Sequence, residues 1–350
     1  MRIVRTLGCV ISACGVVIAA GSLAFAAPCP NNKNALGTSR VLVVDPAEHF
    51  RLGGMQYRET LPLAHREVVL TFDDGPLPPY STHILNVLAA ECVKATYFLV
   101  GGMARAYPRV VARIAAEGHT IGTHSQSHPL TFHKMPLGSA QREIQRGVAS
   151  VTAALGGRRP APFFRIPGLL RTASVERYLA SQKIMTWSAD IPSDDWRRIN
   201  DKEIVRRTLA RLEERGGRGI VLMHDIKPAT ALAVPKLLRE LKARGYRVVH
   251  VVPASRWRTK TATVPSQWLV RTASRQLPQT AGKRTDEVGA SLKTAAGRRE
   301  AARLREASRR RATARVAVIL EEDDPEMLAS FHNTYSFLSE LFRLPGQILQ

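Results

Sequence analysis

The sequence predicts an α/β fold, namely a distorted (β/α)7-type barrel followed by a disordered basic C-terminal tail. Between residues 41 and 252, apolar runs of strand length alternate with segments of helical periodicity. Such alternation calls for parallel strands with helices packed outside them. Seven repeats of the pattern favour a closed or nearly closed barrel over a two-domain arrangement. The candidate polar residues all follow strands directly, at the end where barrels carry their chemistry.

The expected elements divide the chain into a signal segment, a short extension, one barrel domain and a tail. Strands are expected at residues 68–72, 95–100, 120–122, 163–166, 184–187, 219–223 and 246–252. Helices are expected at residues 83–92, 104–117, 138–155, 172–181, 201–215 and 230–244. Residues 40–45 add a strand at the bottom or edge of the barrel. We therefore assign 27–66 to the extension, 67–252 to the barrel and 253–350 to the tail.

The N-terminus predicts export. Two arginines precede an apolar stretch at residues 7–20, and residues 24–26 (Ala-Phe-Ala) form a small-x-small cleavage site. We expect a signal peptide over residues 1–26 and a periplasmic or secreted protein. A retained membrane anchor is the alternative, although the apolar run is short for a bilayer span. Lipidation at Cys14 is a lesser alternative.

The net charge of +22 is concentrated near the C-terminus. Residues 253–315 contain sixteen Lys and Arg against four Asp and Glu, and they are poor in aromatic residues. Such a segment cannot bury enough apolar surface to offset its ordering entropy. In an exported protein, it is expected to contact anionic lipids or acidic envelope polymers rather than nucleic acid. The sequence does not indicate an oligomeric state.

Two cysteines remain after removal of the signal segment, Cys29 and Cys92. Cys92 ends an apolar helical pattern, and a free cysteine packs well as a small hydrophobic residue. We therefore expect a buried free thiol. A disulfide between Cys29 and Cys92 is the alternative in an oxidising compartment.

Two short motifs together offer three metal ligands and one base. Asp73 and Asp74 follow the first strand, and His124 and His128 stand four residues apart after the third. Taken singly, each motif is best explained as a solvated turn or as surface histidines. Together, two imidazoles and one carboxylate would leave coordination positions open for water and substrate, as a catalytic site requires. A divalent ion held there would activate water.

The remaining polar candidates supply an acid and its partners. His224 follows the buried-looking strand at 219–223 and could protonate an amine leaving group. Arg165 and Asp195 could orient and tune the base and the acid by charge pairing. Trp187 lies within a strand and is expected in the core, whereas Trp196 lies in a loop and is expected at the site.

Five motifs carry a family resemblance. They are residues 71–76 (TFDDGP), 124–128 (HSQSH), 164–168 (FRIPG), 194–196 (DDW) and 222–225 (LMHD). In this order, over roughly residues 67–252, the sequence resembles polysaccharide deacetylases with the NodB homology domain, carbohydrate esterase family 4. The resemblance implies a divalent metal ion, commonly zinc, and hydrolysis of N-acetyl or O-acetyl groups on polysaccharides.

The resemblance also implies a role for each matching residue. Asp73 would be the catalytic base and His224 the acid, and Arg165 and Asp195 would position them. The implied metal ligands are Asp74, His124 and His128. The acetyl pocket would be lined by Leu222 and Trp196, with the backbone N–H of Gly168 facing the oxyanion.

Two motifs depart from the family pattern. Pro167 is followed directly by Gly168, where a family member has an intervening residue, commonly aromatic. Pro192 stands where an aspartate is usual, and Asp190 lies two residues earlier. The loops that face the sugar are therefore expected to be unusual.

The sequence thus predicts an exported, metal-dependent hydrolase that acts on carbon–nitrogen bonds. Its expected substrate is an acetylated polysaccharide similar to chitin, peptidoglycan or poly-N-acetylglucosamine. One alternative is an O-acetyl esterase or small-amide hydrolase of the same family. Another is a non-catalytic glycan-binding protein, against which the intact set of polar positions argues.

Overall fold

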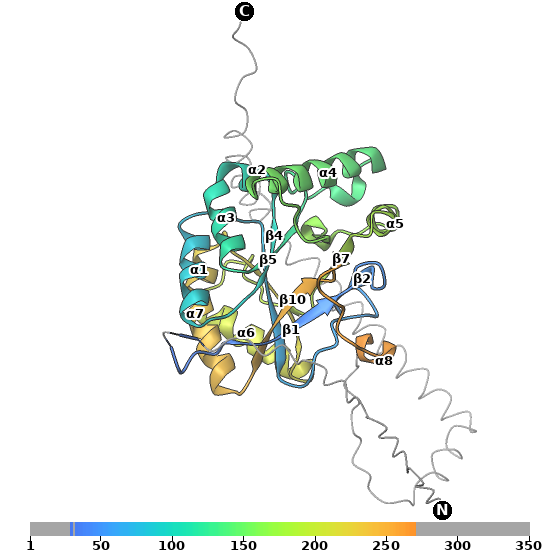
Figure 1. Ribbon diagram of the computed structural model, residues 1–350. Helices are drawn as coiled ribbons and strands as arrows, with labels where there is room; N and C mark the ends of the chain where they lie inside the picture. The colour runs from blue at the N-terminus through green and yellow to red at the C-terminus, as the bar shows by residue number, and fades with distance from the viewer. Residues whose placement is uncertain (1–28, 31, 271–350) are drawn as a thin grey trace, which may run out of the picture. The chain divides into compact units, whose positions relative to one another are not determined.

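A computed structural model of the protein describes residues 29–30 and 32–270 (Figure 1). The expected signal peptide, Cys14 and the tail beyond residue 270 lie outside the described residues. Among the helices that are described, none is both long and apolar enough to cross a membrane.

Parallel strands form the barrel. Its members are β3 (Glu67–Asp73), β4 (Thr96–Leu99), β5 (Thr120–Thr123), β6 (Phe163–Arg165), β7 (Met185–Trp187), β8 (Ile191–Pro192) and β9 (Gly219–His224). Successive strands pair from β3 to β7, while β9 pairs with both β8 and β3. β7 and β8 belong to one continuous segment, residues 185–192, and this segment connects β7 to the side of the barrel formed by β8, β9 and β3. The predicted α/β barrel is confirmed.

The last expected strand takes a different place from the others. This strand, β10 (Arg247–Pro253), pairs with β3 only at Arg247 and Val248 and otherwise with β1 (Thr38–Val44). Thr120, which begins β5, donates a 2.6 Å hydrogen bond to the carbonyl of Val251. β10 therefore crosses the amino ends of the barrel strands. β1 lies at the edge of the sheet, as expected, and the short β2 (Arg51–Leu52) pairs with β7.

Helices cover the outside of the barrel (Figure 1). They are α1 (Tyr80–Ala90), α2 (Gly101–Ala106), α3 (Pro108–Ala116), α4 (Leu137–Ala154), α5 (Ala173–Ser181), α6 (Asp201–Glu214), α7 (Pro228–Ala243) and α8 (Pro265–Trp268), with short 3-10 helices at Phe132–Lys134 and Pro167–Leu169. The single helix expected at 104–117 is instead two, α2 and α3. Pro108 causes the break, because proline lacks an N–H donor and disfavours a helical conformation at the preceding residue, Tyr107.

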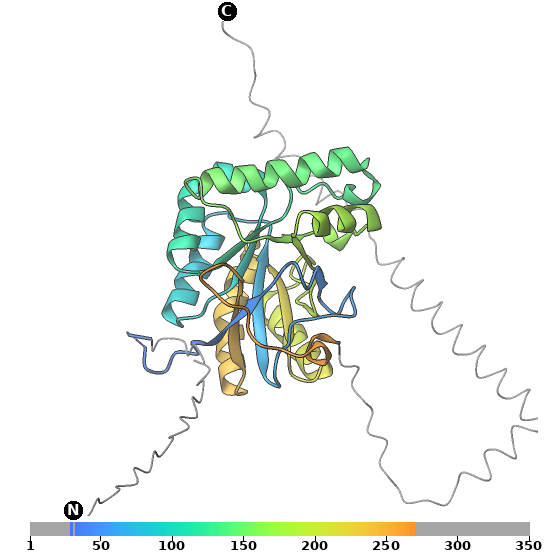
Figure 2. The same cartoon turned by 45° about the vertical axis from the view of Figure 1, so that its right-hand side comes forward.

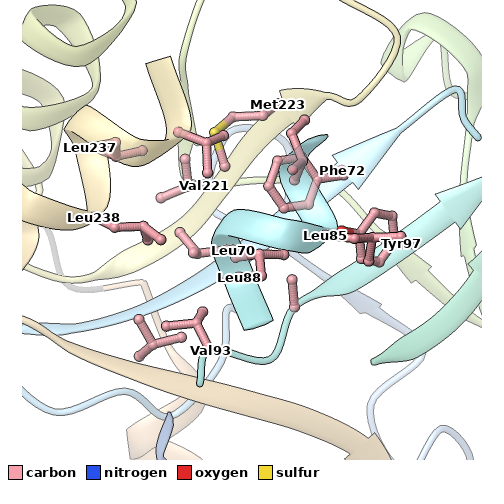
Figure 3. Close-up of a cluster of buried hydrophobic side chains, with 14 of the residues drawn as sticks. Leu70, Phe72, Leu85, Leu88, Val93, Tyr97, Val221, Met223, Leu237 and Leu238 are labelled. Atoms are coloured by element: carbon pink, nitrogen blue, oxygen red, sulfur yellow. The ribbon is translucent and has the colours of Figure 1, made fainter. Parts of the chain in front are cut away.

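Apolar side chains are buried on both faces of the strands. Leu70 and Phe72 of β3 point outward and pack against α1 and α7, together with Val221 and Met223 of β9 (Figure 3). Intervening residues such as Val69 point into the barrel, where Trp187 is buried as expected. Burial on both faces explains why these strands read as continuous apolar runs.

Cys29 and Cys92 form a disulfide, with Cα atoms 5.6 Å apart. The expectation of a buried free thiol at Cys92 is therefore wrong. α1 ends at Ala90, so Cys92 lies beyond the apolar face of the helix, in a left-handed conformation with φ 50°. The N-terminal segment runs beside this helix end, where Gly37 donates a 2.9 Å hydrogen bond to the carbonyl of Glu91.

The described chain continues past residue 252, where we expected the domain to end. Residues 254–270, here called the strap, run from the end of β10 to α8 (Figure 2). The Thr261 N–H donates to the carbonyl of Val43 across 2.9 Å. Trp268 is buried and stacks on His49 with ring centroids 3.4 Å apart. The strap is thus an ordered part of the barrel domain.

Candidate active site

The turn after β3 separates two neighbouring carboxylates. β3 ends at Asp73, and the chain turns at Asp74, which has φ 76°. Aspartate tolerates this left-handed conformation better than most residues do. The Gly75–Pro76 peptide bond that follows is cis. The two side chains consequently face different partners and have different environments.

Asp74 faces two histidines. Its Oδ1 lies 3.4 Å from Nε2 of His124 and 3.4 Å from Nε2 of His128. His124 follows β5 directly, and a tight turn brings His128 back beside it, with the His128 N–H donating to Ser125 Oγ across 3.0 Å. One ligand atom from each of the three residues fits within 4.8 Å of the others.

The protonation of these histidines suits metal binding. His124 Nδ1 lies 2.6 Å from the carbonyl oxygen of Arg165, so it donates there and leaves the lone pair of Nε2 facing Asp74. Burial lowers the pKa of His124 to about 3 and also lowers that of His128, so both rings are neutral at physiological pH. Two neutral imidazoles and one carboxylate are a donor set that fits a divalent ion such as Zn²⁺.

Asp73 is held by Arg165, which is fully buried at the end of β6. Arg165 Nη1 donates to Asp73 Oδ1 across 2.6 Å and to Thr71 Oγ1 across 2.8 Å. Its Nη2 donates to the carbonyl of Ser188 across 2.9 Å, and the guanidinium stacks on the Phe98 ring. Burial raises the pKa of Asp73 to about 6, although Arg165 opposes the rise. A carboxylate with such a pKa can accept a proton near neutral pH.

His224 lies across the site, where β9 pairs in register with β3. Its Nδ1 is 2.7 Å from Asp195 Oδ1, and its side chain is 14% exposed. Burial alone would lower the pKa of His224, but the negative charge of Asp195 and the hydrogen bond to it raise the pKa to about 9. Trp196 packs edge-on against the imidazole, with ring centroids 5.9 Å apart. His224 is thus a protonated imidazolium at neutral pH.

The residues expected to line an acetyl pocket differ in exposure. Leu222 is 5% exposed and belongs to the barrel core, against which the half-buried Trp196 packs. Gly168 and Leu169 have φ values of 58° and 57°, so the last residue of the third motif and the residue after it are both left-handed. A Cβ on Gly168 would lie 3.3 Å from Leu170 Cδ1. A neighbouring leucine therefore limits the space beside Gly168.

The second motif departure has a structural explanation. Pro192 forms part of β8, and the nearby Asp190 turns away to serve as an anchor. Asp190 Oδ1 accepts a hydrogen bond from the Gly54 N–H, and Oδ2 accepts from Thr60 Oγ1 and the Ile220 N–H. Asp190 therefore does not replace the aspartate that the family motif places near the sugar.

Comparisons with known proteins agree with this geometry. Residues 61–187 match a family model described as polysaccharide deacetylase. The chain is 34% identical over 190 residues to a peptidoglycan-N-acetylglucosamine deacetylase of Bacillus cereus, a match that covers 51% of this chain and 66% of the relative. It is also 34% identical to a chitooligosaccharide deacetylase of Rhizobium leguminosarum bv. trifolii, covering 49% of this chain and 77% of that protein. The chain belongs to the polysaccharide deacetylase family.

A solved member of the family supports the same barrel. The peptidoglycan deacetylase of Bdellovibrio bacteriovorus shares 34% identity with a TM-score of 0.55, over 62% of this chain and 59% of that chain. The chain spans about two thirds, or less, of the length of these two peptidoglycan deacetylases.

Sequence reasoning assigned no role to the residues that brace the turn after β3. Asp225 is fully buried, and its N–H donates to the carbonyl of Asp73. Ser81 Oγ lies 2.5 Å from Asp225 Oδ2 and also accepts a 2.7 Å hydrogen bond from the Leu77 N–H. Burial raises the pKa of Asp225 to about 7. The position of Asp225 inside the fifth motif was a usable signal, whereas nothing in the sequence marked Ser81.

Proposed function

We propose that this protein is an exported, metal-dependent deacetylase that removes N-acetyl groups from an envelope polysaccharide. One observation carries the proposal: the ligand atoms of Asp74, His124 and His128 fit within 4.8 Å of one another, beside a buried carboxylate and an imidazolium whose strands pair in register. The base is Asp73, held by Arg165, and the acid is His224, held by Asp195. Hydrolysis of an amide needs a base for the attacking water and an acid for the departing nitrogen.

Asp74, His124 and His128 would hold the metal ion, and the donor set favours zinc. When bound, the ion would supply water activation and polarisation of the acetyl carbonyl. Every other function falls to the side chains and backbone of the protein.

Asp73 accepts a proton from the attacking water, whose oxygen forms a new bond to the acetyl carbon. Arg165 keeps the Asp73 carboxylate oriented through Oδ1, while Oδ2 lies 3.8 Å from His124 Nε2, on the side of the candidate metal ligands, where it can reach the water. The Gly168 N–H is the candidate donor to the oxyanion, and Trp196 and Leu222 would enclose the acetyl methyl group. His224 then donates its proton to the sugar nitrogen as the carbon–nitrogen bond breaks, so that acetate and a free amine are released.

An amide is favoured over an ester because of His224. An amine nitrogen leaves only after protonation, whereas an alkoxide depends less on a strong acid. An imidazolium with a pKa of about 9 stays protonated across the neutral range. The names of the relatives, peptidoglycan-N-acetylglucosamine and chitooligosaccharide deacetylases, point to glucosamine-containing polymers as first candidates.

The test is acetate release from peptidoglycan, chitin oligomers and acetylxylan, with and without a chelator. We expect acetate release from an N-acetylated polymer. The chelator should abolish this release, and added Zn²⁺ should restore it. His224→Ala should lower amide hydrolysis by about 10²–10⁴-fold, the usual contribution of a general acid. Preferential release from acetylxylan would instead identify an esterase. Glycan binding without acetate release from any polymer would contradict the enzyme assignment.

A further inference from the structure

The strap presents a tight turn that is firmly tied at its base. Ser255 and Arg258 exchange two backbone hydrogen bonds of 3.0 Å each, which leaves Arg256 and Trp257 as the two residues of the tip. Just beyond the turn, Val43 donates to Thr261 Oγ1 across 2.9 Å. The tip is therefore held in a fixed position on the domain.

Trp257 at this tip is 83% exposed, more than any other large apolar side chain that the structure describes. The Arg256 guanidinium lies 4.7 Å from the centroid of its ring. Val264 and Leu269, farther along the strap, are 56% and 53% exposed. Several exposed large apolar side chains on one segment are unusual for a surface without a binding partner.

All charged residues of the strap are basic. Residues 254–270 include Arg256, Arg258 and Lys260 and contain no aspartate or glutamate. Lys260 is paired with Glu48 on the neighbouring turn, which leaves Arg256 and Arg258, on either side of Trp257, as the main source of positive charge. The surface therefore combines an exposed indole with cations on both sides of it.

We propose that the tip docks on the surface of an anionic lipid bilayer. Tryptophan concentrates at membrane–water interfaces, because its ring is apolar while its N–H remains hydrated. Arginines beside it would contact lipid phosphates. A sugar polymer could also stack on Trp257, but it would gain little from Val264 and Leu269, whereas these aliphatic side chains favour the interface.

The location of the strap is compatible with catalysis at a membrane surface. The strap follows β10, which crosses the amino ends of the barrel strands, while Asp73 and His224 lie at the carboxyl ends. Docking through the tip would therefore leave the candidate active site open. The inference does not depend on which polysaccharide is the substrate.

The experiment measures co-sedimentation of the full chain with phosphatidylcholine vesicles, with and without phosphatidylglycerol. The variants are Trp257→Ser, the pair Arg256→Gln/Arg258→Gln, and Leu232→Ser as a control. Leu232 is 59% exposed on α7, so Leu232→Ser also removes an exposed apolar side chain, but outside the strap. Any vesicle binding by the rest of the chain is common to all variants. Differences in binding between the variants therefore measure the contribution of the tip.

Trp257→Ser should weaken binding to the anionic vesicles about tenfold, as expected for partial burial of a large apolar side chain. The arginine pair should weaken it roughly thirtyfold at low salt, since each cation near an anionic surface contributes about fivefold. Leu232→Ser should bind like the parent. Brominated lipid should quench the fraction of the tryptophan emission that comes from Trp257. In Trp257→Phe, this quenched fraction should disappear.

Equal vesicle binding by the parent and the tip variants would overturn the proposal. So would an unchanged fraction of quenched emission in Trp257→Phe. Loss of binding to an acidic glycan by Trp257→Ser, with vesicle binding intact, would identify a polymer-binding tip instead. Unchanged acetate release from a soluble oligomer shows that each variant is folded.

Discussion

His224 donates two hydrogen bonds to Asp195, one from its ring Nδ1 to Oδ1 and one from its backbone N–H to Oδ2, each 2.7 Å long. Thr230 Oγ1 donates a third, of 2.6 Å, to Oδ2. Burial alone would raise the pKa of Asp195, but the charge of His224 and these hydrogen bonds lower it. Asp195 therefore remains ionised and keeps the imidazole both oriented and protonated.

Asp195→Asn should shift the alkaline limb of the pH profile to lower pH. The acid must be protonated, so activity falls as the pH rises through the pKa of His224, about 9. Removing the negative charge lowers this pKa, by one unit or more for a partner in direct contact. The measurement is kcat/KM for acetate release against pH. Thr230→Val keeps the charge and is the control, for which a much smaller shift is expected.

Chelation should lower both activity and the melting temperature. A metal ion that binds only the folded state adds roughly 2.7 kcal/mol at a concentration one hundred times its dissociation constant. Zn²⁺ should therefore raise the melting temperature of the chelated protein, and His128→Ala should lose most of this rise. His83 is exposed on α1, so His83→Ala is a matched control. An equal rise in His128→Ala would place the metal elsewhere.

Gly75→Ala should destabilise the fold and disturb the catalytic turn. A Cβ at this position would lie 2.2 Å from both carboxylate oxygens of Asp225, which Ser81 and the Asp73 backbone hold in place. Overpacking of this kind costs about 1–3 kcal/mol or more. Urea denaturation measures the free energy of unfolding. Gly138→Ala, where the nearest atom is a flexible arginine nitrogen 3.6 Å away, should cause little loss.

The sequence was sufficient to locate the polar site because of one geometric rule. Asp73, His124, Arg165 and His224 each end or directly follow a strand, and parallel strands share their carboxyl ends. That rule needs no knowledge of loop conformation.

Contacts that depend on loop paths could not be predicted in this way. Asp190 resembles a displaced motif residue in the sequence, yet its carboxylate binds Gly54 and Thr60, more than a hundred residues earlier. The apolar run that forms β10 looks like any other buried strand, and nothing local in it specifies that its main partner is β1. The pairing of Cys29 with Cys92 likewise depends on where the N-terminal segment runs.

Reduction of the Cys29–Cys92 disulfide should lower stability without altering catalysis. The two residues are 63 positions apart, and a cross-link of that span typically contributes roughly 2–4 kcal/mol. A reductant should therefore lower the urea midpoint of the parent protein. The double variant Cys29→Ser/Cys92→Ser should start from the lower midpoint and show no further response. A lower urea midpoint of the double variant in the presence of reductant would point to a different disulfide.

Removal of Arg165 should shift the acidic limb of the pH profile to higher pH. Asp73 acts as an ionised base, so activity rises with pH through its pKa, about 6. Arg165 lowers that pKa, and its loss would raise it and leave less carboxylate at neutral pH.

The first variant is Arg165→Met, and the measurement is kcat/KM against pH. This variant leaves Asp73 buried without its partner, which lowers the free energy of unfolding by about 3–5 kcal/mol and could prevent folding. Arg165→Lys retains the positive charge and is the second variant, for which a smaller shift of the acidic limb is expected. Asp73→Asn should abolish the limb together with activity. If the acidic limb stayed at the parent pH in both arginine variants, Asp73 would not be the base, because no other described cation donates a hydrogen bond to its carboxylate.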